Sequence, residues 1–173
     1  MLLLFTSSGS TKNDDAYQYL EVGKYSIQTT GVLEEMLRGA VYFTTETKIS
    51  ETGVSYASLA ICFNTNIENE SHKMKFLISE KNPNNRIDAG VYKVAHKFDS
   101  LLNYFDGVFG FADVEKLGEL PFFASDGKIR IDAIDEEILK GSIAIVLEKN
   151  SGETISVSGN FVAPIAKKNQ INE

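Results

Sequence analysis

The feature that most restricts the fold is a regular alternation of apolar with small or polar residues near the end of the chain. In residues 142–147 every second residue is Ile or Leu, and a similar period of two runs through residues 155–161. A period of two places alternate side chains on one face of a β-strand. Residues 149–153 lie between these segments and include Gly152, and a Gly-containing loop of this length predicts a β-hairpin.

Similar stretches, separated by turn residues, recur along the chain. Further strands are predicted at residues 38–47, 54–64, 73–79, 90–95 and 128–132. Residues 81–85, Lys-Asn-Pro-Asn-Asn, predict a turn, because Pro fixes φ and Asn tolerates left-handed geometry. Residues 32–37 and 98–105 instead carry apolar residues at helix spacing, and each predicts one short helix.

These elements predict one all-β domain of about eight or nine strands. We expect an antiparallel β-sandwich of immunoglobulin-like or jelly-roll type, and an eight-stranded calycin-type barrel is the alternative. The domain is expected to span residues 17–166. A leader and polar linker would precede it at residues 1–16, and a polar tail would follow at residues 167–173.

Charge and cysteine content exclude several classes of protein. The net charge is −7, and no segment holds a Lys/Arg cluster, so we expect no nucleic-acid partner. The single cysteine, Cys62, cannot form an intramolecular disulfide, and its apolar neighbours predict a buried thiol. The histidines His72 and His96 are too few to form a zinc site with one cysteine. We find no catalytic constellation and expect that the protein is not an enzyme.

Acidic residues gather in one predicted hairpin loop. Asp132, Asp135 and Glu136 lie there, between two predicted strands. Calcium takes several oxygen ligands from flexible loops, so these three residues are the candidate metal ligands. No other cofactor is expected.

Residues 98–123 hold seven of the 18 aromatic residues of the chain. The candidate ligand-binding residues in this stretch are Phe105, Phe109, Phe111, Phe122 and Phe123. Flat rings could line an apolar or sugar-stacking groove, or they could pack as core at one end of the domain. In either case we expect at least three of these five rings to be buried together.

The first residues of the chain indicate a cellular location. Residues 1–5 are apolar and rich in Leu, residues 6–10 are mostly small and polar, and a polar segment follows. This order resembles the end of a bacterial lipoprotein signal. With the acidity and β content, the chain resembles small exported lipoproteins of the Bacteroidetes type. That family has an acylated Cys where Ser7 or Ser8 stands here. Ser8, taken as the replaced attachment position, cannot form the thioether.

The resemblance implies an exported protein of the periplasm or outer membrane, with a cytoplasmic location as the alternative. Peripheral membrane attachment would require a lipid. We expect no transmembrane span, because five apolar residues are far fewer than the roughly 20 that a helix needs.

Three functions remain open from the sequence. The first is a non-catalytic cell-envelope binding or accessory subunit, whose partner is an envelope protein or a small ligand. The second is a β-barrel that binds a small apolar ligand, and the third is a carbohydrate-active enzyme. The direction in which the rings of residues 105–123 point would separate them: into a core, into a cavity or into an open cleft.

Overall fold

The computed structural model describes residues 20–50, 53–65, 71–81, 84, 86–95 and 106–166. These residues form strands joined by turns, with a single turn of 3-10 helix, η2 (Glu115–Leu117). The strands are β1 (Lys24–Gly31), β2 (Met36–Ile49), β3 (Ser55–Thr65), β4 (His72–Lys81), β5 (Gly90–Lys93), β6 (Gly107–Val114), β7 (Phe122–Ile134), β8 (Ile138–Glu148) and β9 (Thr154–Pro164). The leader at 1–16, the tail at 167–173 and the predicted helix at 98–105 lie outside the described residues.

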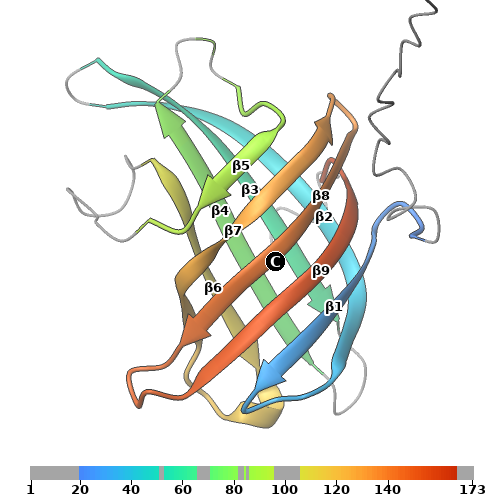
Figure 1. Cartoon of the computed structure of the whole chain (residues 1–173). Helices are drawn as coiled ribbons and strands as arrows, with labels where there is room; N and C mark the ends of the chain where they lie inside the picture. Colours follow the sequence, from blue (N-terminus) through green and yellow to red (C-terminus); the bar gives the residue numbers. More distant parts are fainter. Residues whose placement is uncertain are drawn as a thin grey trace, which may run out of the picture.

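The strands form one closed antiparallel barrel (Figure 1). They follow the order β5-β7-β6-β4-β3-β2-β1-β9-β8, and β8 also pairs with β7 along most of its length. That last pairing closes eight strands into a ring, and β5 is an extra strand beside β7. The all-β prediction is confirmed, with the barrel alternative as the architecture. The β-sandwich prediction is wrong. A sandwich has two separate sheets, whereas here the pairing of β7 with β8 closes eight strands of one sheet into a ring.

The interior of the barrel is filled by side chains from alternate positions of the strands. Phe63 lies at the centre of the aromatic part of this core. Its ring makes edge-on contacts with Tyr25, Phe161 and Phe76, at centroid distances of 5.2, 5.4 and 6.1 Å. Small barrels are typically packed in this way, with large residues facing small ones. Gly110 on β6 supplies one small position, because a Cβ there would meet the ring of Phe76.

The two ends of the barrel are built differently. At one end lie η2 and the β1–β2 and β8–β9 turns, at the bottom of Figure 1, and we call this the η2 end. Lys149 on the β8–β9 turn donates a hydrogen bond of 2.6 Å to the carbonyl oxygen of Leu117, whose side chain packs against the core. The opposite end carries the β2–β3 and β7–β8 hairpins. The η2 end is therefore partly covered by a short helical turn.

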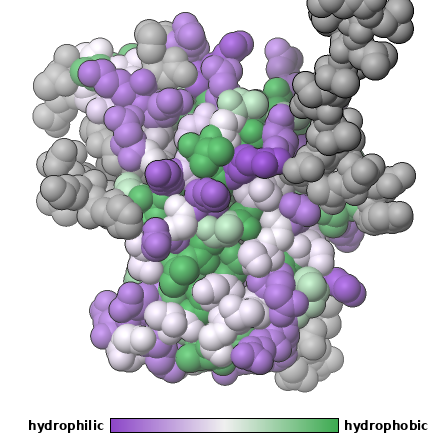
Figure 2. Space-filling view, in the orientation of Figure 1, coloured by the Kyte–Doolittle hydropathy of each residue, from purple (hydrophilic) through white to green (hydrophobic). Residues whose placement is uncertain are grey.

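Part of the outer surface of the barrel is uncharged. White and green residues occupy much of the middle of the face seen in Figure 2, where β8 and β9 run in Figure 1. The outward positions at the centre of these strands hold Ser142, Ala144, Val146, Ser156, Ser158 and Asn160. They alternate with buried Ile, Val and Leu, so this hairpin has the predicted period of two.

The predicted helix at residues 32–37 is wrong. Residues 32–35 form the turn between β1 and β2, and Met36 already begins β2. The hydroxyl of Thr29 donates to the carbonyl oxygen of Glu35 and accepts from its amide, at 3.0 and 3.1 Å. These bonds hold the turn in place of helical ones. Cys62, by contrast, is a buried free thiol as predicted.

Candidate functional site

The predicted aromatic cluster is divided between the two faces of the barrel wall. Phe122 points inward and is 1% exposed, whereas its neighbour Phe123 is 44% exposed on the outside. Phe109 and Phe111 on β6 are half-buried at outward positions, and the rings of Phe109 and Phe123 lie 6.4 Å apart. Phe105 lies outside the described residues. The expected joint burial of at least three rings is wrong, because alternation along a strand sends successive side chains to opposite faces. A ligand-binding role for the outward rings stays a prediction.

The predicted calcium ligands are not brought together. Asp132 pairs with Arg130 on β7, with an O–N distance of 2.6 Å. Asp135 accepts hydrogen bonds from the backbone amides of residues 137 and 138, which lower the pKa of its carboxyl group. It therefore shapes the β7–β8 turn, where Glu136 is also found. Within the described ranges no three His, Cys, Asp or Glu side chains are placed to hold a metal ion. The calcium site stays a prediction.

A polar pair that the sequence did not single out lies inside the barrel. The hydroxyl of Tyr25 on β1 is hydrogen-bonded to Nε2 of His72 on β4, and both side chains are buried. The residues that separate them across the wall are small. Gly39 is the register partner of Tyr25, and Thr65 is the register partner of His72. Gly39 has no side chain, and a Cβ there would meet the backbone of Asn64 and the side chain of Thr65 on β3.

The pair could be found only in part from the sequence. His72 precedes Met74, Phe76 and Ile78 at intervals of two, so the alternation that predicts β4 also predicts an inward His72. His96, the other histidine, lies outside the described residues, as does Ser8. The partner Tyr25 is 47 residues away along the chain, and nothing local connects the two.

A cleft of about 290 Å³ opens at the η2 end beside this pair. We call it the His72 cleft. It is lined by Glu35, Met36, Leu37, Arg38, Thr65, Ser71, His72, Val114 and Lys116. Leu37, His72 and Val114 are buried and form its inner part. The cleft thus combines an apolar wall with hydroxyl groups and an imidazole, and charged side chains stand at its rim.

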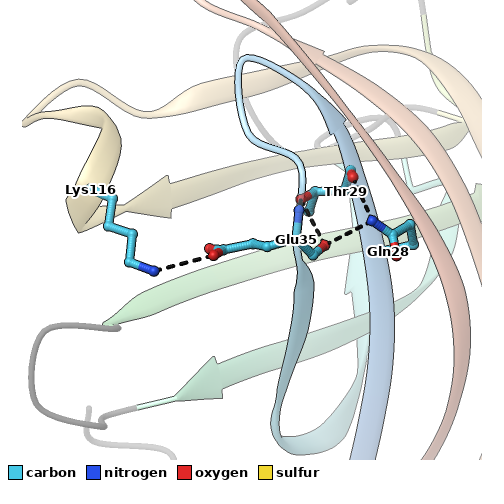
Figure 3. Close-up of polar contacts among 4 residues, drawn as sticks. All are labelled: Gln28, Thr29, Glu35 and Lys116. Carbon is cyan, nitrogen blue, oxygen red and sulfur yellow. Dashed lines mark hydrogen bonds and ion pairs between the residues drawn. The ribbon is translucent and has the colours of Figure 1, made fainter.

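An ion pair crosses the rim of the His72 cleft. Nζ of Lys116 on η2 lies 3.2 Å from a carboxylate oxygen of Glu35, which belongs to the β1–β2 turn (Figure 3). The backbone of Glu35 is fixed by Thr29, and Gln28 also donates to its carbonyl oxygen at 3.2 Å. The side chains of Lys116 and Glu35 are 40% and 34% exposed. The pair therefore joins two separate chain segments while still in contact with solvent.

Two further cavities help to define the site. One of about 450 Å³ lies on the other side of Ser71 and His72, and it is lined by Lys73, Asp113, Glu115, Gly118 and Glu119 as well. The other, about 400 Å³, lies at the opposite end of the barrel. It has Thr45, Thr47, Ala57, Ser58, Ile87 and Ile134 in its walls, with Glu46, Arg86, Asp88, Asp135 and Glu136. Arg86 is paired with Asp88 at 2.8 Å. This opposite cavity is therefore acidic at its rim.

The buried hydroxyl of Tyr25 predicts a pH dependence of stability. Burial raises its pKa well above the usual 10.0. Above pH 10 the unfolded chain loses this proton while the folded chain keeps it, so folding stability falls as the pH rises. The expected contribution is about 1.4 kcal/mol per pH unit. Urea unfolding between pH 10 and 12 should show that the free energy of unfolding falls more steeply with pH for the native protein than for Tyr25→Phe. The difference in this free energy between the two proteins at pH 7 is the reference. Equal slopes would contradict the assignment.

The described residues contain no helix of the length and apolarity needed to cross a membrane. Comparison of the chain with protein-family models, with curated proteins and with solved structures finds no match.

Proposed function

We propose that the barrel is a non-catalytic binding protein that holds a small molecule with an apolar body in the His72 cleft. The observation that carries this proposal is that the buried His72, which is hydrogen-bonded to Tyr25, lines an open cleft. Burying polar side chains in an apolar core lowers stability unless they are hydrogen-bonded, as these two are to each other. A buried polar group that also lines an open cleft supports a binding role, because ligand sites place a few polar groups in apolar walls. A β-barrel is compatible with this role, since barrel mouths commonly hold small ligands.

The residues that line the His72 cleft also favour ligand binding at the η2 end of the barrel. Ligand sites combine apolar walls with a few convergent polar groups that orient the ligand. Met36, Leu37 and Val114 supply such a wall, and Thr65 and Ser71 supply hydroxyl groups beside the imidazole. The cavity at the opposite end has four carboxylates at its rim instead. An apolar molecule would have to desolvate those charges, which disfavours binding there.

The envelope address is a separate part of the proposal. It depends on the lipoprotein-like residues 1–16 and on Ser8, which lie outside the described residues. An exported binding protein of this kind would act on a ligand that reaches the cell envelope. Expression behind a complete signal with Ser8→Cys, followed by palmitate labelling, tests the address independently of ligand binding.

Binding of N-phenyl-1-naphthylamine, an uncharged apolar dye whose fluorescence rises in apolar surroundings, tests the cleft. We expect saturable binding by the full chain and its loss in Ser71→Trp, because Ser71 lines the His72 cleft and the cavity beside it. The matched control is Thr47→Trp, which places the same side chain at the opposite cavity. Both variants should keep the melting temperature of the native protein within a few degrees.

Two results would overturn the proposal. One is the absence of saturable dye binding by the native chain. The other is a loss of binding in Thr47→Trp with retention in Ser71→Trp, which would place the ligand at the opposite end of the barrel.

A further inference from the structure

Among the described residues that line the His72 cleft, cations outnumber acids, although the chain as a whole has a net charge of −7. These cations are Arg38 and Lys116, and the one acid among the described lining residues is Glu35. Lys116 is paired with Glu35, but among the described residues no carboxylate pairs with Arg38. An acidic protein that keeps two cations at one cleft has a local preference for anions that its overall charge would not suggest.

The Glu35–Lys116 pair can be exchanged for another partner at low cost. Exposed ion pairs contribute little to stability, because water already solvates both charges well. Glu35 is held in place through its backbone by Thr29 and Gln28, independently of its carboxylate. An incoming anion can therefore replace the Glu35 carboxylate at Lys116 without unfolding the β1–β2 turn.

Three acidic residues in the neighbouring cavity indicate on which side of His72 the anionic group would bind. Asp113, Glu115 and Glu119 line the neighbouring cavity, on the far side of Ser71 and His72, together with a single described cation, Lys73. They would repel an anionic group placed there. The group is therefore expected on the side of Arg38 and Lys116.

We propose that the ligand of the His72 cleft is a small amphipathic organic anion. Its apolar body lies against Met36, Leu37 and Val114, and its acidic group binds Lys116 and Arg38 in place of Glu35. Glu35 is then a specificity-determining residue, because an anion must displace its carboxylate from Lys116, whereas an uncharged molecule binds more weakly beside the intact ion pair. This inference rests on the proposed function.

Two dyes with the same aromatic body test the charge preference. 8-Anilinonaphthalene-1-sulfonate differs from N-phenyl-1-naphthylamine by one sulfonate group. We expect the full chain to bind the sulfonate dye about tenfold more tightly or better, since charge-assisted hydrogen bonds are the stronger kind. Fluorescence titration of both dyes at one salt concentration gives the ratio of the two Kd values.

Variants at the rim assign the preference to named groups. In Arg38→Gln/Lys116→Gln the sulfonate dye should lose most of its advantage, so the ratio of the two Kd values should fall towards one. In Glu35→Gln the sulfonate dye should bind about threefold more tightly or better, because the carboxylate of Glu35 no longer competes with the dye for Lys116. Lys128→Gln/Lys140→Gln, an equal loss of two positive charges from exposed positions of β7 and β8, is the control for the double variant and should change neither Kd.

The outcomes separate the two proposals. If both dyes bind with the same Kd, or if the advantage of the sulfonate survives in the double variant, the anion inference is overturned and the proposed function stands. If neither dye binds the native chain, the proposed function fails, and the anion inference fails with it. A melting temperature within a few degrees of that of the native protein shows that the double variant is folded.

Discussion

Replacing Phe122 with alanine is expected to lower the free energy of unfolding by about 3–5 kcal/mol. Phe122 is 1% exposed inside the barrel, and the change would leave a cavity that a closed ring of strands can fill only in part. The same replacement at the next residue, Phe123, is expected to cost less than about 1 kcal/mol. Phe123 is 44% exposed on the outer face. Urea unfolding of the two variants measures both values.

This pair of variants tests the placement of the rings with neighbouring residues of one type. Equal losses of stability would contradict the inward and outward assignments on β7. The same proteins also test the predicted ligand-binding role of the outward rings. Phe123→Ala should leave binding of N-phenyl-1-naphthylamine unchanged if the His72 cleft is the site. Weaker dye binding in Phe123→Ala at unchanged stability would favour the outer face instead.

The aromatic stretch also shows where sequence patterns mislead. Residues 107–114 form β6, yet no strand is predicted there. Its outward positions hold Phe109 and Phe111, and its inward positions include Gly110 and Ala112. The usual pattern is therefore inverted, with the large apolar residues outside. Residue 110 must be small because Phe76 of β4 occupies the space, and that neighbour is unknown until the strands are paired.

The choice between sandwich and barrel could not be made from alternation. Inward residues of either architecture follow a period of two, so β2, β3, β4, β8 and β9 are predicted equally well by both. Closure depends on pairing between distant strands. β7 shares two register pairs with β6, at residues 111–112 and 122–123, and then runs beside β5 and β8. A four-residue strand such as β5 carries too little pattern to reveal this role.

The candidate site illustrates the same division between local and distant information. The inward position of His72 follows from the alternation in β4. The groups that make a site of it do not, because Tyr25 is 47 residues away, and Lys116 lies 81 residues from Glu35. Each contact results from closing the barrel, which brings the β1–β2 turn and η2 to the two sides of one cleft.

The closing of the barrel rests in turn on a few positions where a strand can approach its neighbour only without a side chain. Gly110 is one of them. A Cβ on Gly110 would lie 2.8 Å from the carbonyl oxygen of Lys75 and nearer still to the ring of Phe76. Real Cβ atoms do not approach other atoms so closely, so β4, β6 or the ring would have to move.

Gly110→Ala is therefore expected to lower the free energy of unfolding by about 3 kcal/mol, at the upper end of the usual range for overpacking. Gly90→Ala is the matched control. Gly90 is also a strand glycine, and its Cβ would meet only the ring of Tyr92 at an ordinary 3.7 Å, so this change should alter stability by less than about 1 kcal/mol.

In a Phe76→Leu background the cost of Gly110→Ala should fall by about 1 kcal/mol or more, because the smaller side chain vacates part of the space. The rescue stays partial, since the carbonyl oxygen of Lys75 does not move away. Urea unfolding of the four proteins of this cycle measures the coupling, and additive costs would show that the ring of Phe76 does not press on β6.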